Sequence, residues 1–214
     1  DSRQSRGLGD VYKRQALQHR AVTIDPNKIK RYKNISIGDS HAVCMYRPRW
    51  ENVSRPFSTL HGSIKKGFET FIPGASEYNI IETYFGNIDI RHHLCRFDDP
   101  ILEAKKLADR YARELSRISR KYGAKTFAYE PLPIENESRK VPKTGWYKGT
   151  PFFGSWDERN EVREAFISQL QLNANVYMWT DQLKNYAGEL SFDVMEKPQS
   201  CLLYTSDAAD EVDR

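Results

Sequence analysis

The chain has 214 residues, with 33 lysines and arginines against 29 aspartates and glutamates and a formal net charge of +4. This length suits one domain with a sizeable core, and the weak, well-mixed charge argues against a nucleic-acid partner. No apolar run in the sequence reaches the roughly 20 residues that a membrane-spanning helix needs, so no membrane span is expected.

The three cysteines also limit the class of protein. Cys201 lies near the C-terminus, and Cys44 and Cys95 form neither a disulfide framework nor a paired metal-binding motif. This usage favours a reducing compartment, so a cytoplasmic location is expected, although a signal peptide ahead of the first residue stays open. Neither a cofactor nor a bound metal is expected.

Both ends of the chain are expected to be foreign to the native protein. Residues 10–15 can be encoded by a DNA string whose reverse complement, read one base out of frame, encodes residues 201–206. That DNA element resembles the transposase end used in sequencing-library adapters. Because adapter-derived tails are excluded from fold reasoning, residues 1–15 and 201–214 are set aside, and residues 16–200 are taken as the native domain, open at both ends.

The native part begins with a polar and basic lead-in over residues 16–33, which runs into a short buried strand at residues 34–37. The next expected elements are a short strand, a short amphipathic helix and a β-rich run that suits a central strand. They lie at residues 57–60, 64–71 and 80–85.

The clearest element is a helix with Asp98 and Asp99 as candidate caps, Pro100 at its first position and Gly123 as its stop. Ser155 and Glu158 predict a capping box for a second helix. The remaining expected elements are a strand at 126–129, a long loop at 130–154 and a short helix at 182–186, with the segments 176–179 and 190–194 closing the readable part. Strands that alternate with helices indicate a single α/β domain with three layers, α/β/α, and about five mostly parallel strands.

The turn after the first strand contains the candidate chemistry. In an open α/β sheet, reactive side chains collect at the carboxyl ends of the strands, so Ser40 in Gly38-Asp39-Ser40 is a candidate nucleophile. The alternative is an ordinary turn, because Gly, Asp and Ser are common turn residues. The turns around Gly62 and residues 86–93 are expected at the same edge, where backbone N–H groups and the Asn87 amide would meet an oxyanion.

These motifs together resemble the SGNH (GDSL-like) hydrolases, which are flavodoxin-like α/β esterases and acyl hydrolases. Gly38-Asp39-Ser40 matches the serine block, and Gly86-Asn87-Ile88-Asp89 resembles the Gly-x-Asn-Asp block, with the asparagine one position early. The resemblance implies that Ser40 is the nucleophile and that the Gly62 N–H and the Asn87 amide bind the oxyanion. The residues expected to line the site are Asp39, His41, Asp89, Arg91, His92 and His93.

The general base is the main departure from the family pattern. The family places an Asp-x-x-His block late in the chain, whereas the histidines here are His19, His41, His61, His92 and His93. Asp193 lies where the approach to that block is expected, which makes it a candidate acid residue. The expectation is that the catalytic histidine was encoded beyond residue 200 and that this chain is inactive or nearly so. His92 or His93 as a substitute base is the alternative.

The expected function is therefore serine-dependent ester hydrolysis or deacylation of a small molecule or a glycan ester such as an acylated carbohydrate. Two alternatives stay open. Asp39 and His41 also resemble the opening motif of metallophosphoesterases, in which Asp89, His92 and His93 would be further metal ligands. A non-catalytic glycan-binding module is the other, based on the basic and aromatic loop residues, among them Arg139, Lys143, Trp146 and Tyr147.

Overall fold

The computed structural model describes residues 32–72, 77–141 and 148–191. Several predicted features lie outside these residues: the two adapter-derived tails, Asp193, and the loop residues Lys143, Trp146 and Tyr147. The division into tails and a native domain at residues 16–200 therefore stays a prediction.

Five parallel strands form one sheet in the order β2-β1-β3-β4-β5. The strands are β1 (Asn34–Gly38), β2 (Glu51–Ser54), β3 (Ile80–Tyr84), β4 (Lys125–Tyr129) and β5 (Val176–Tyr177). All four neighbouring pairs are parallel, and in the central pair Gly38 is the register partner of Tyr84. This strand order is that of the flavodoxin-like folds, which confirms the predicted α/β class with five parallel strands.

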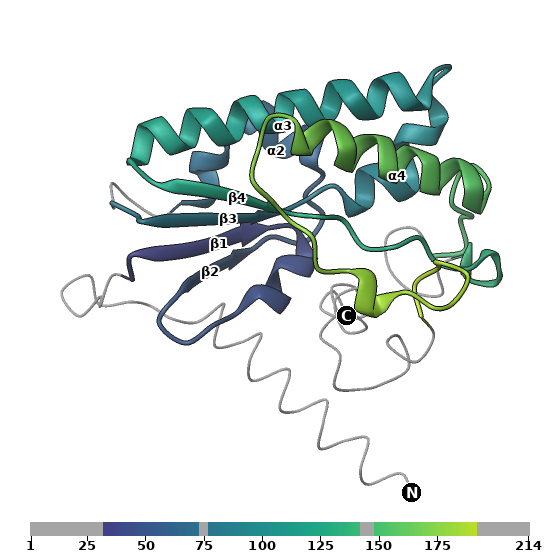
Figure 1. Ribbon diagram of the computed structural model, residues 1–214, viewed down its shortest axis with the longest axis horizontal. Coiled ribbons are helices and arrows are strands. Elements are labelled where there is room, and N and C mark those ends of the chain that lie inside the picture. The colour runs from purple at the N-terminus through teal and green to yellow at the C-terminus, as the bar shows by residue number, and fades with distance from the viewer. Residues whose placement is uncertain (1–31, 73–76, 142–147, 192–214) are drawn as a thin grey trace, which may run out of the picture. The chain divides into compact units, whose positions relative to one another are not determined.

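Three α-helices lie on one side of the sheet in Figure 1: α2 (Leu60–Lys66), α3 (Pro100–Tyr122) and α4 (Trp156–Gln171). The two predicted helix starts are confirmed, because Asp99 caps α3 and the Ser155–Glu158 capping box begins α4. Gly123 ends α3 with a left-handed φ of 64°, which a glycine adopts without strain. In the parts of the chain that the structure describes, no helix is long and apolar enough to cross a bilayer.

Short helical turns complete the description of the chain. They are η1 (Ser40–Met45), η2 (Phe68–Phe71), η4 (Leu94–Arg96), η5 (Glu137–Arg139) and η6 (Asp181–Leu183), which are 3₁₀ helices, and η3 (Asp89–His93), which is a π-helix. π-helices are rare and are frequently found at functional sites. The π-helix η3 follows β3, so it stands at the same edge of the sheet as η1.

Two hydrophobic clusters pack against the two faces of the sheet. The larger one joins Ile35 and Ile37 of β1 and Ile81 of β3 to the helices, with Tyr111 of α3 and Phe166 of α4 among its members. The smaller one joins η1 to the last described segment and consists of Ala42, Met45, Tyr84, Leu132, Leu183 and Leu190. Tyr84 therefore lies on the face opposite α3, directly against the turn that contains Ser40.

The second strand was predicted in the wrong place. Residues 57–60 are not a strand, and β2 is Glu51–Ser54, a half-buried edge strand with too few apolar residues to give a strand pattern. Residues 60–66 instead form α2, because Thr59 caps the helix by accepting a hydrogen bond from the Gly62 N–H. Gly62 is thus inside the first turn of a helix and not in a turn at the end of a strand.

Candidate functional site

The serine turn begins at Gly38, which packs tightly against Tyr84 of β3. A Cβ atom added to Gly38 would lie 2.3 Å from the Tyr84 carbonyl oxygen and 2.6 Å from Ala42 Cβ, so no other residue fits at this position. The next residue is tied to the same carbonyl, since the Asp39 N–H donates to the Tyr84 oxygen at 3.1 Å. The glycine of the serine block is therefore a packing requirement of this edge.

Asp39 is the N-cap of η1 and is completely buried. Its Oδ1 accepts two hydrogen bonds from His41, one from the backbone N–H at 2.8 Å and one from ring Nδ1 at 3.1 Å. The His41 ring also stands edge-on against Tyr84, with the ring centroids 6.1 Å apart. The aspartate thus fixes both the turn and the orientation of the neighbouring imidazole.

The edge strand β2 supports the serine turn from the other side. The Ser54 hydroxyl donates to the Asp39 carbonyl at 2.8 Å and to the Ser40 carbonyl at 3.3 Å. The Asn52 amide donates to the Ala42 carbonyl within η1 at 2.8 Å. Ser54 and Asn52 were not predicted as site residues, because their role depends on the parallel pairing of β1 with β2.

Ser40 itself is the first residue of η1 and is partly exposed. Within the described residues, its hydroxyl makes no hydrogen bond, to a histidine or to any other side chain. A hydroxyl at the carboxyl end of a central strand, held by fixed neighbours and open to solvent, has the placement expected of a nucleophile.

Asn87 and Arg91 lie side by side behind this turn and are both buried. Asn87 Oδ1 accepts hydrogen bonds from Arg91 Nη1 at 3.1 Å and from the Leu132 N–H at 2.9 Å. Arg91 also pairs with Glu135 at 2.5 Å and donates to the Pro133 carbonyl at 3.2 Å. Arg91 therefore anchors the segment that follows β4, and the Asn87 amide nitrogen is left without a partner.

Asp89 links the π-helix η3 to α2. Its two carboxylate oxygens accept the N–H groups of Leu60 at 2.7 Å and His61 at 3.2 Å, which are the first two of α2. Burial raises the pKa of the Asp89 carboxyl, an effect that these two hydrogen bonds oppose. Asp89 thus holds together two of the predicted turns.

His92 is buried in η3, and its ring packs edge-on against Phe152 with centroids 4.6 Å apart. Burial first, and then the charges of Arg91 and other neighbouring cations, lower the pKa of His92 to about 3. The imidazole is therefore neutral at physiological pH. His93 is partly exposed, and its ring centroid lies 6.4 Å from that of His92.

Of the four predicted loop residues, only Arg139 lies within the described residues, at the end of η5. Two aromatics of the same loop differ in their surroundings. Phe152 is buried between His92 and the Arg159 guanidinium, whereas Phe153 is 49% exposed under the Arg96 guanidinium. Phe152 is therefore part of the core, and Phe153 is available at the surface.

The residues predicted as metal ligands do not form a metal-binding cluster within residues 32–72, 77–141 and 148–191. No three His, Cys, Asp or Glu side chains among them are placed to hold a metal ion. The Asp39 and His41 side chains bind each other, and the Asp89 carboxylate is occupied by the start of α2. These residues serve the local structure.

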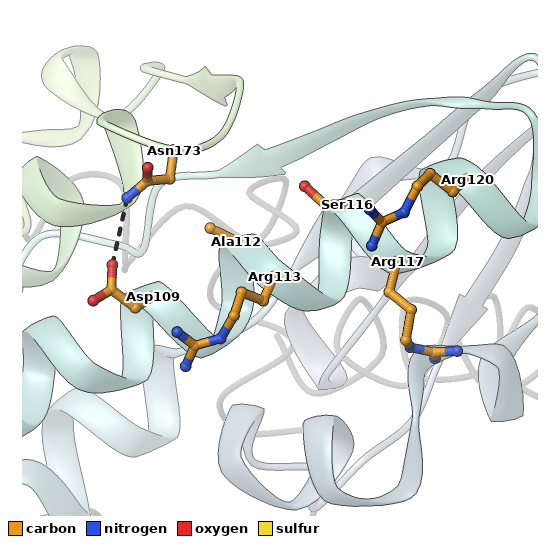
Figure 2. A pocket seen from close by; sticks show the side chains of 7 residues that line it. All are labelled: Asp109, Ala112, Arg113, Ser116, Arg117, Arg120 and Asn173. Carbon is orange, nitrogen blue, oxygen red and sulfur yellow. Dashed lines mark hydrogen bonds between the residues drawn. The ribbon is translucent and has the colours of Figure 1, made fainter.

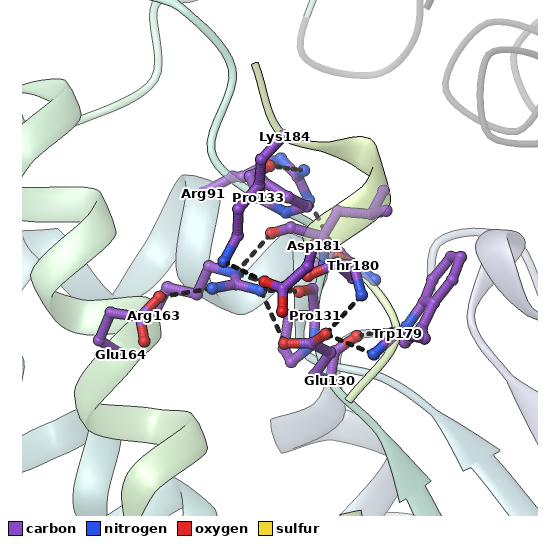
Figure 3. Close-up of polar contacts among 12 residues, drawn as sticks. Arg91, Glu130, Pro131, Pro133, Arg163, Glu164, Trp179, Thr180, Asp181 and Lys184 are labelled. Atoms are coloured by element: carbon purple, nitrogen blue, oxygen red, sulfur yellow. Dashed lines mark hydrogen bonds and ion pairs between the residues drawn. The ribbon is translucent and has the colours of Figure 1, made fainter. Parts of the chain in front are cut away.

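A second buried polar cluster stands at the carboxyl ends of β4 and β5, and we name it the Arg163 cluster. It consists of Glu130, Arg163, Trp179 and Thr180 together with the carbonyls of Pro131 and Leu132 (Figure 3). Arg163 pairs with Glu130 at 3.0 Å and donates to the Thr180 hydroxyl at 2.9 Å. The other Glu130 oxygen accepts the N–H groups of Trp179 and Thr180, each at 2.6 Å.

A shallow groove lies on the outer surface of α3 and is shown in Figure 2. It is lined by Asp109, Ala112, Arg113, Ser116, Arg117, Arg120 and Asn173. Arg117 is engaged by Glu114 and Glu69, and the Asp109 carboxylate accepts from Gln169 at 2.8 Å. None of the residues predicted for the site lines this groove.

Comparison with known proteins identifies the fold. No family model and no curated protein matches the chain. A candidate platelet activating factor from Streptococcus pneumonia is similar in structure, with a TM-score of 0.54 and 15% identity over 89% of this chain and 87% of that one. A candidate acylhydrolase from Bacteroides fragilis NCTC 9343 has a TM-score of 0.52 and 10% identity over 80% and 78%.

A member of the lipolytic protein G-D-S-L family from Veillonella parvula DSM 2008 is a more distant neighbour, with a TM-score of 0.47 and 14% identity over 80% of this chain and 92% of that one. The fold assignment rests on the strand order and the first two structures. The chain shares its α/β fold with these two structures, and this is the fold that the resemblance to the SGNH (GDSL-like) hydrolases implies.

Proposed function

We propose that the protein is a serine-dependent ester hydrolase or deacylase with Ser40 as its nucleophile. The observation that supports this most is the placement of Ser40 on an SGNH-type fold, at the carboxyl end of β1 and next to the buried Asp39–His41 pair. In this proposal the Ser40 oxygen attacks the ester carbonyl, the alcohol leaves, and water then releases the acid from the acyl-enzyme.

The developing oxyanion needs donors close to Ser40. The Ser40 N–H and the Asn87 amide are the proposed donors, because both N–H groups of that amide have no partner in the described structure. Gly62 is the weakest of the three predicted donors, because its N–H already donates to Thr59 Oγ1 at 3.0 Å.

The general base determines how fast the protein hydrolyses an ester, because it takes the proton of the attacking hydroxyl. No histidine in the described residues makes a hydrogen bond to the Ser40 hydroxyl, and His92 is packed against Phe152. A late Asp-x-x-His block, with Asp193 at its approach, remains our proposed source of the base. We therefore expect the 214-residue chain to react with activated reagents at Ser40 but to hydrolyse esters slowly.

The loop between β2 and α2 suggests the class of substrate. It runs beside the serine turn, since the Arg55 N–H donates to the Gly38 carbonyl at 3.0 Å. Within it Phe57 is 58% exposed and has a left-handed φ of 61°, which costs energy for a residue with a Cβ. An exposed aromatic ring held in this way suits contact with an acyl group, so we propose a small acyl ester as the substrate, with an acylated carbohydrate as one form.

A fluorophosphonate probe tests the nucleophile directly. It should label the folded chain at Ser40, and Ser40→Ala should abolish the labelling. Ser58→Ala is the matched control, because Ser58 is a partly buried serine of the adjacent loop that we place outside the site. A folded protein that is not labelled, or is labelled equally after Ser40→Ala, contradicts the proposal.

Glycan binding without catalysis is the second candidate. The exposed Phe153 ring, with the Arg96 guanidinium 5.1 Å from its centroid, gives a surface on which a sugar ring stacks. On a glycan array, binding that is lost in Phe153→Ala and unchanged in Ser40→Ala would favour this candidate over the hydrolase.

A further inference from the structure

A row of aromatic side chains lies on the face of the sheet opposite α2, α3 and α4 (Figure 1). Tyr84, Tyr129 and Tyr177 are the last residues of β3, β4 and β5, three strands that are neighbours in the sheet. The residues before Tyr129 and Tyr177 pack with the helices, so these tyrosines point to the opposite face, as Tyr84 does. The register partner of Tyr84 is Gly38, which leads into the serine turn. The row therefore runs from the serine turn to the edge strand β5, along the edge where open α/β sheets bind ligands.

The rings of this row are in contact with one another. The ring centroid of Tyr129 lies 6.1 Å from that of Tyr84 and 5.1 Å from that of Tyr177. Phe127 of β4 is stacked on Tyr177, with the centroids 4.8 Å apart and the ring planes inclined by 17°. Trp179 joins the row from the segment after β5, at 5.9 Å from Tyr84 and 6.2 Å from Tyr129. We name these five residues the aromatic row.

The aromatic row is buried at the serine turn and open to solvent at its outer end. Tyr84 is buried, whereas Tyr177 is 40% exposed. The other three members, Phe127, Tyr129 and Trp179, are half-buried. Rings that pack on one another keep a fixed orientation, so their exposed faces form a surface that exists before any ligand arrives. Contiguous apolar surface of this kind marks an interaction site.

The polar groups beside the row indicate a neutral ligand. Arg47 donates to the Tyr129 hydroxyl and pairs with the buried Glu82 at 3.0 Å, so this pair adds no net charge to the surface. The Arg47 side chain is 41% exposed, and its guanidinium has five N–H groups, more than these contacts use. Aromatic faces beside such donors complement the C–H face and the hydroxyls of a neutral sugar, whereas an anion would need an unpaired cation.

We propose that the aromatic row binds the sugar units of a neutral oligosaccharide whose ester is cleaved at Ser40, with a sugar hydroxyl as the alcohol that leaves. Neighbouring strands are about 4.8 Å apart, so β5 lies about 14 Å from β1, further than one sugar ring reaches. Phe57, the proposed contact of the acyl group, follows β2 on the other side of β1, so the acyl and sugar parts extend from Ser40 in opposite directions. Cleavage of this substrate rests on the proposed function of Ser40, whereas binding of the sugar units does not.

Isothermal titration calorimetry of the 214-residue chain tests this binding. The probes are cellotetraose, xylotetraose, mannotetraose and N-acetylchitotetraose, each with its monosaccharide as the reference. At least one tetrasaccharide should bind about tenfold more tightly than its monosaccharide, because it contacts several rings of the row at once. Tyr177→Ala should weaken that binding about tenfold, whereas Tyr177→Phe, which keeps the ring, should bind as the unmodified chain does. No binding of any tetrasaccharide at millimolar concentration, or equal binding in Tyr177→Ala, overturns the proposal.

Tyr186→Ala is the matched control variant, because Tyr186 is a fully exposed tyrosine outside the row. It should bind the tetrasaccharide as the unmodified chain does, and so should Phe153→Ala. A loss in either control that equals or exceeds the loss in Tyr177→Ala overturns the proposal.

Two further measurements separate the alternatives. In sedimentation velocity, a dimer of the unmodified chain that dissociates in Tyr177→Ala, with no tetrasaccharide bound, would assign the row to self-association and overturn the proposal. Fluorophosphonate labelling reports on Ser40 independently of the row. Labelling without tetrasaccharide binding would remove the glycan surface and leave the nucleophile in place. Binding without labelling would leave the glycan surface in place and remove the proposed function.

Discussion

Two buried polar clusters stand at the same edge of the sheet, and they differ in how completely their atoms are paired. In the Arg163 cluster the guanidinium and both Glu130 oxygens are engaged by side chains or backbone groups (Figure 3). In the serine-turn cluster, which consists of Asp39, Ser40, His41, Tyr84 and Asn87, three atoms have no partner. A fully paired network fixes the course of the chain, whereas an incompletely paired one leaves hydrogen-bonding capacity for chemistry.

The largest expected effect is on stability, from Arg163→Met. Removal of the guanidinium leaves the Glu130 carboxylate buried without its cation, which costs about 3–5 kcal/mol. Urea unfolding followed by fluorescence measures the loss. The double variant with Glu130→Gln should recover part of it, because the unpaired charge is then removed. A loss below about 1 kcal/mol in Arg163→Met would contradict the structural role of the cluster.

Acid should destabilise the serine edge through His92. The pKa of this histidine is about 3 in the folded protein, below its usual value of 6.5, so protons bind the unfolded chain more tightly. The contribution is complete above pH 6.5 and is lost as the pH falls toward 3, by up to about 1.4 kcal/mol per pH unit.

The measurement is the free energy of unfolding at several pH values for the unmodified chain and for His92→Gln. The variant should lose stability less steeply below pH 6.5, the usual pKa of a histidine. His61→Gln is the control, because His61 is exposed. Parallel curves for the unmodified chain and His92→Gln would show that this imidazole is not held neutral. The raised pKa of Asp89 acts in the opposite direction in all three proteins and cancels in the comparison.

Asp39→Ala should affect chemistry more than stability. The loss of an N-cap costs about 1 kcal/mol, but the His41 ring also loses the group that orients it. Fluorophosphonate labelling of Ser40 should therefore slow by about tenfold or more. The labelling rate of Asp39→Asn should lie between those of the unmodified chain and Asp39→Ala, because the asparagine Oδ1 still accepts the His41 N–H. Unchanged labelling in Asp39→Ala would place the pair outside the reaction.

The smallest effect is expected in the groove on α3 (Figure 2). Arg120 lines that groove on the outer surface of the helix, and within residues 32–72, 77–141 and 148–191 it has no ion-pair partner. Arg120→Ala should change the free energy of unfolding by less than about 0.5 kcal/mol and leave Ser40 labelling unchanged. A larger change in either measurement would show that the two clusters are not the only polar groups that matter.

The helices α3 and α4 could be predicted closely from the sequence. Their caps are local, since Asp99 accepts the N–H of Leu102, and Ser155 and Glu158 satisfy each other. The parallel strands were also predictable, because Ile80 to Tyr84 is a run of β-favouring residues in a chain where strands and helices alternate. In these elements the determining contacts join residues that are close in the chain.

The second strand and the surroundings of Ser40 could not be predicted as closely from the sequence. β2 is recognisable only through its pairing with β1, and Gly62 was misplaced because Thr59, three residues earlier, caps a helix there. Tyr84 is an ordinary strand residue in the sequence. Its position against Asp39 and Asn87 depends on the register of β3 with β1.

The sequence by itself therefore determined the α/β class, the two long helices and a serine at the end of a central strand. Only the tertiary structure decided which groups surround that serine. Ser54 and Asn52 support its turn from β2, the Asp39–His41 pair stands beside it, and Tyr84 of β3 packs against the His41 ring. The reason is physical, because helix caps and strand patterns are short-range, whereas the partners of a buried polar atom are set by the register between strands.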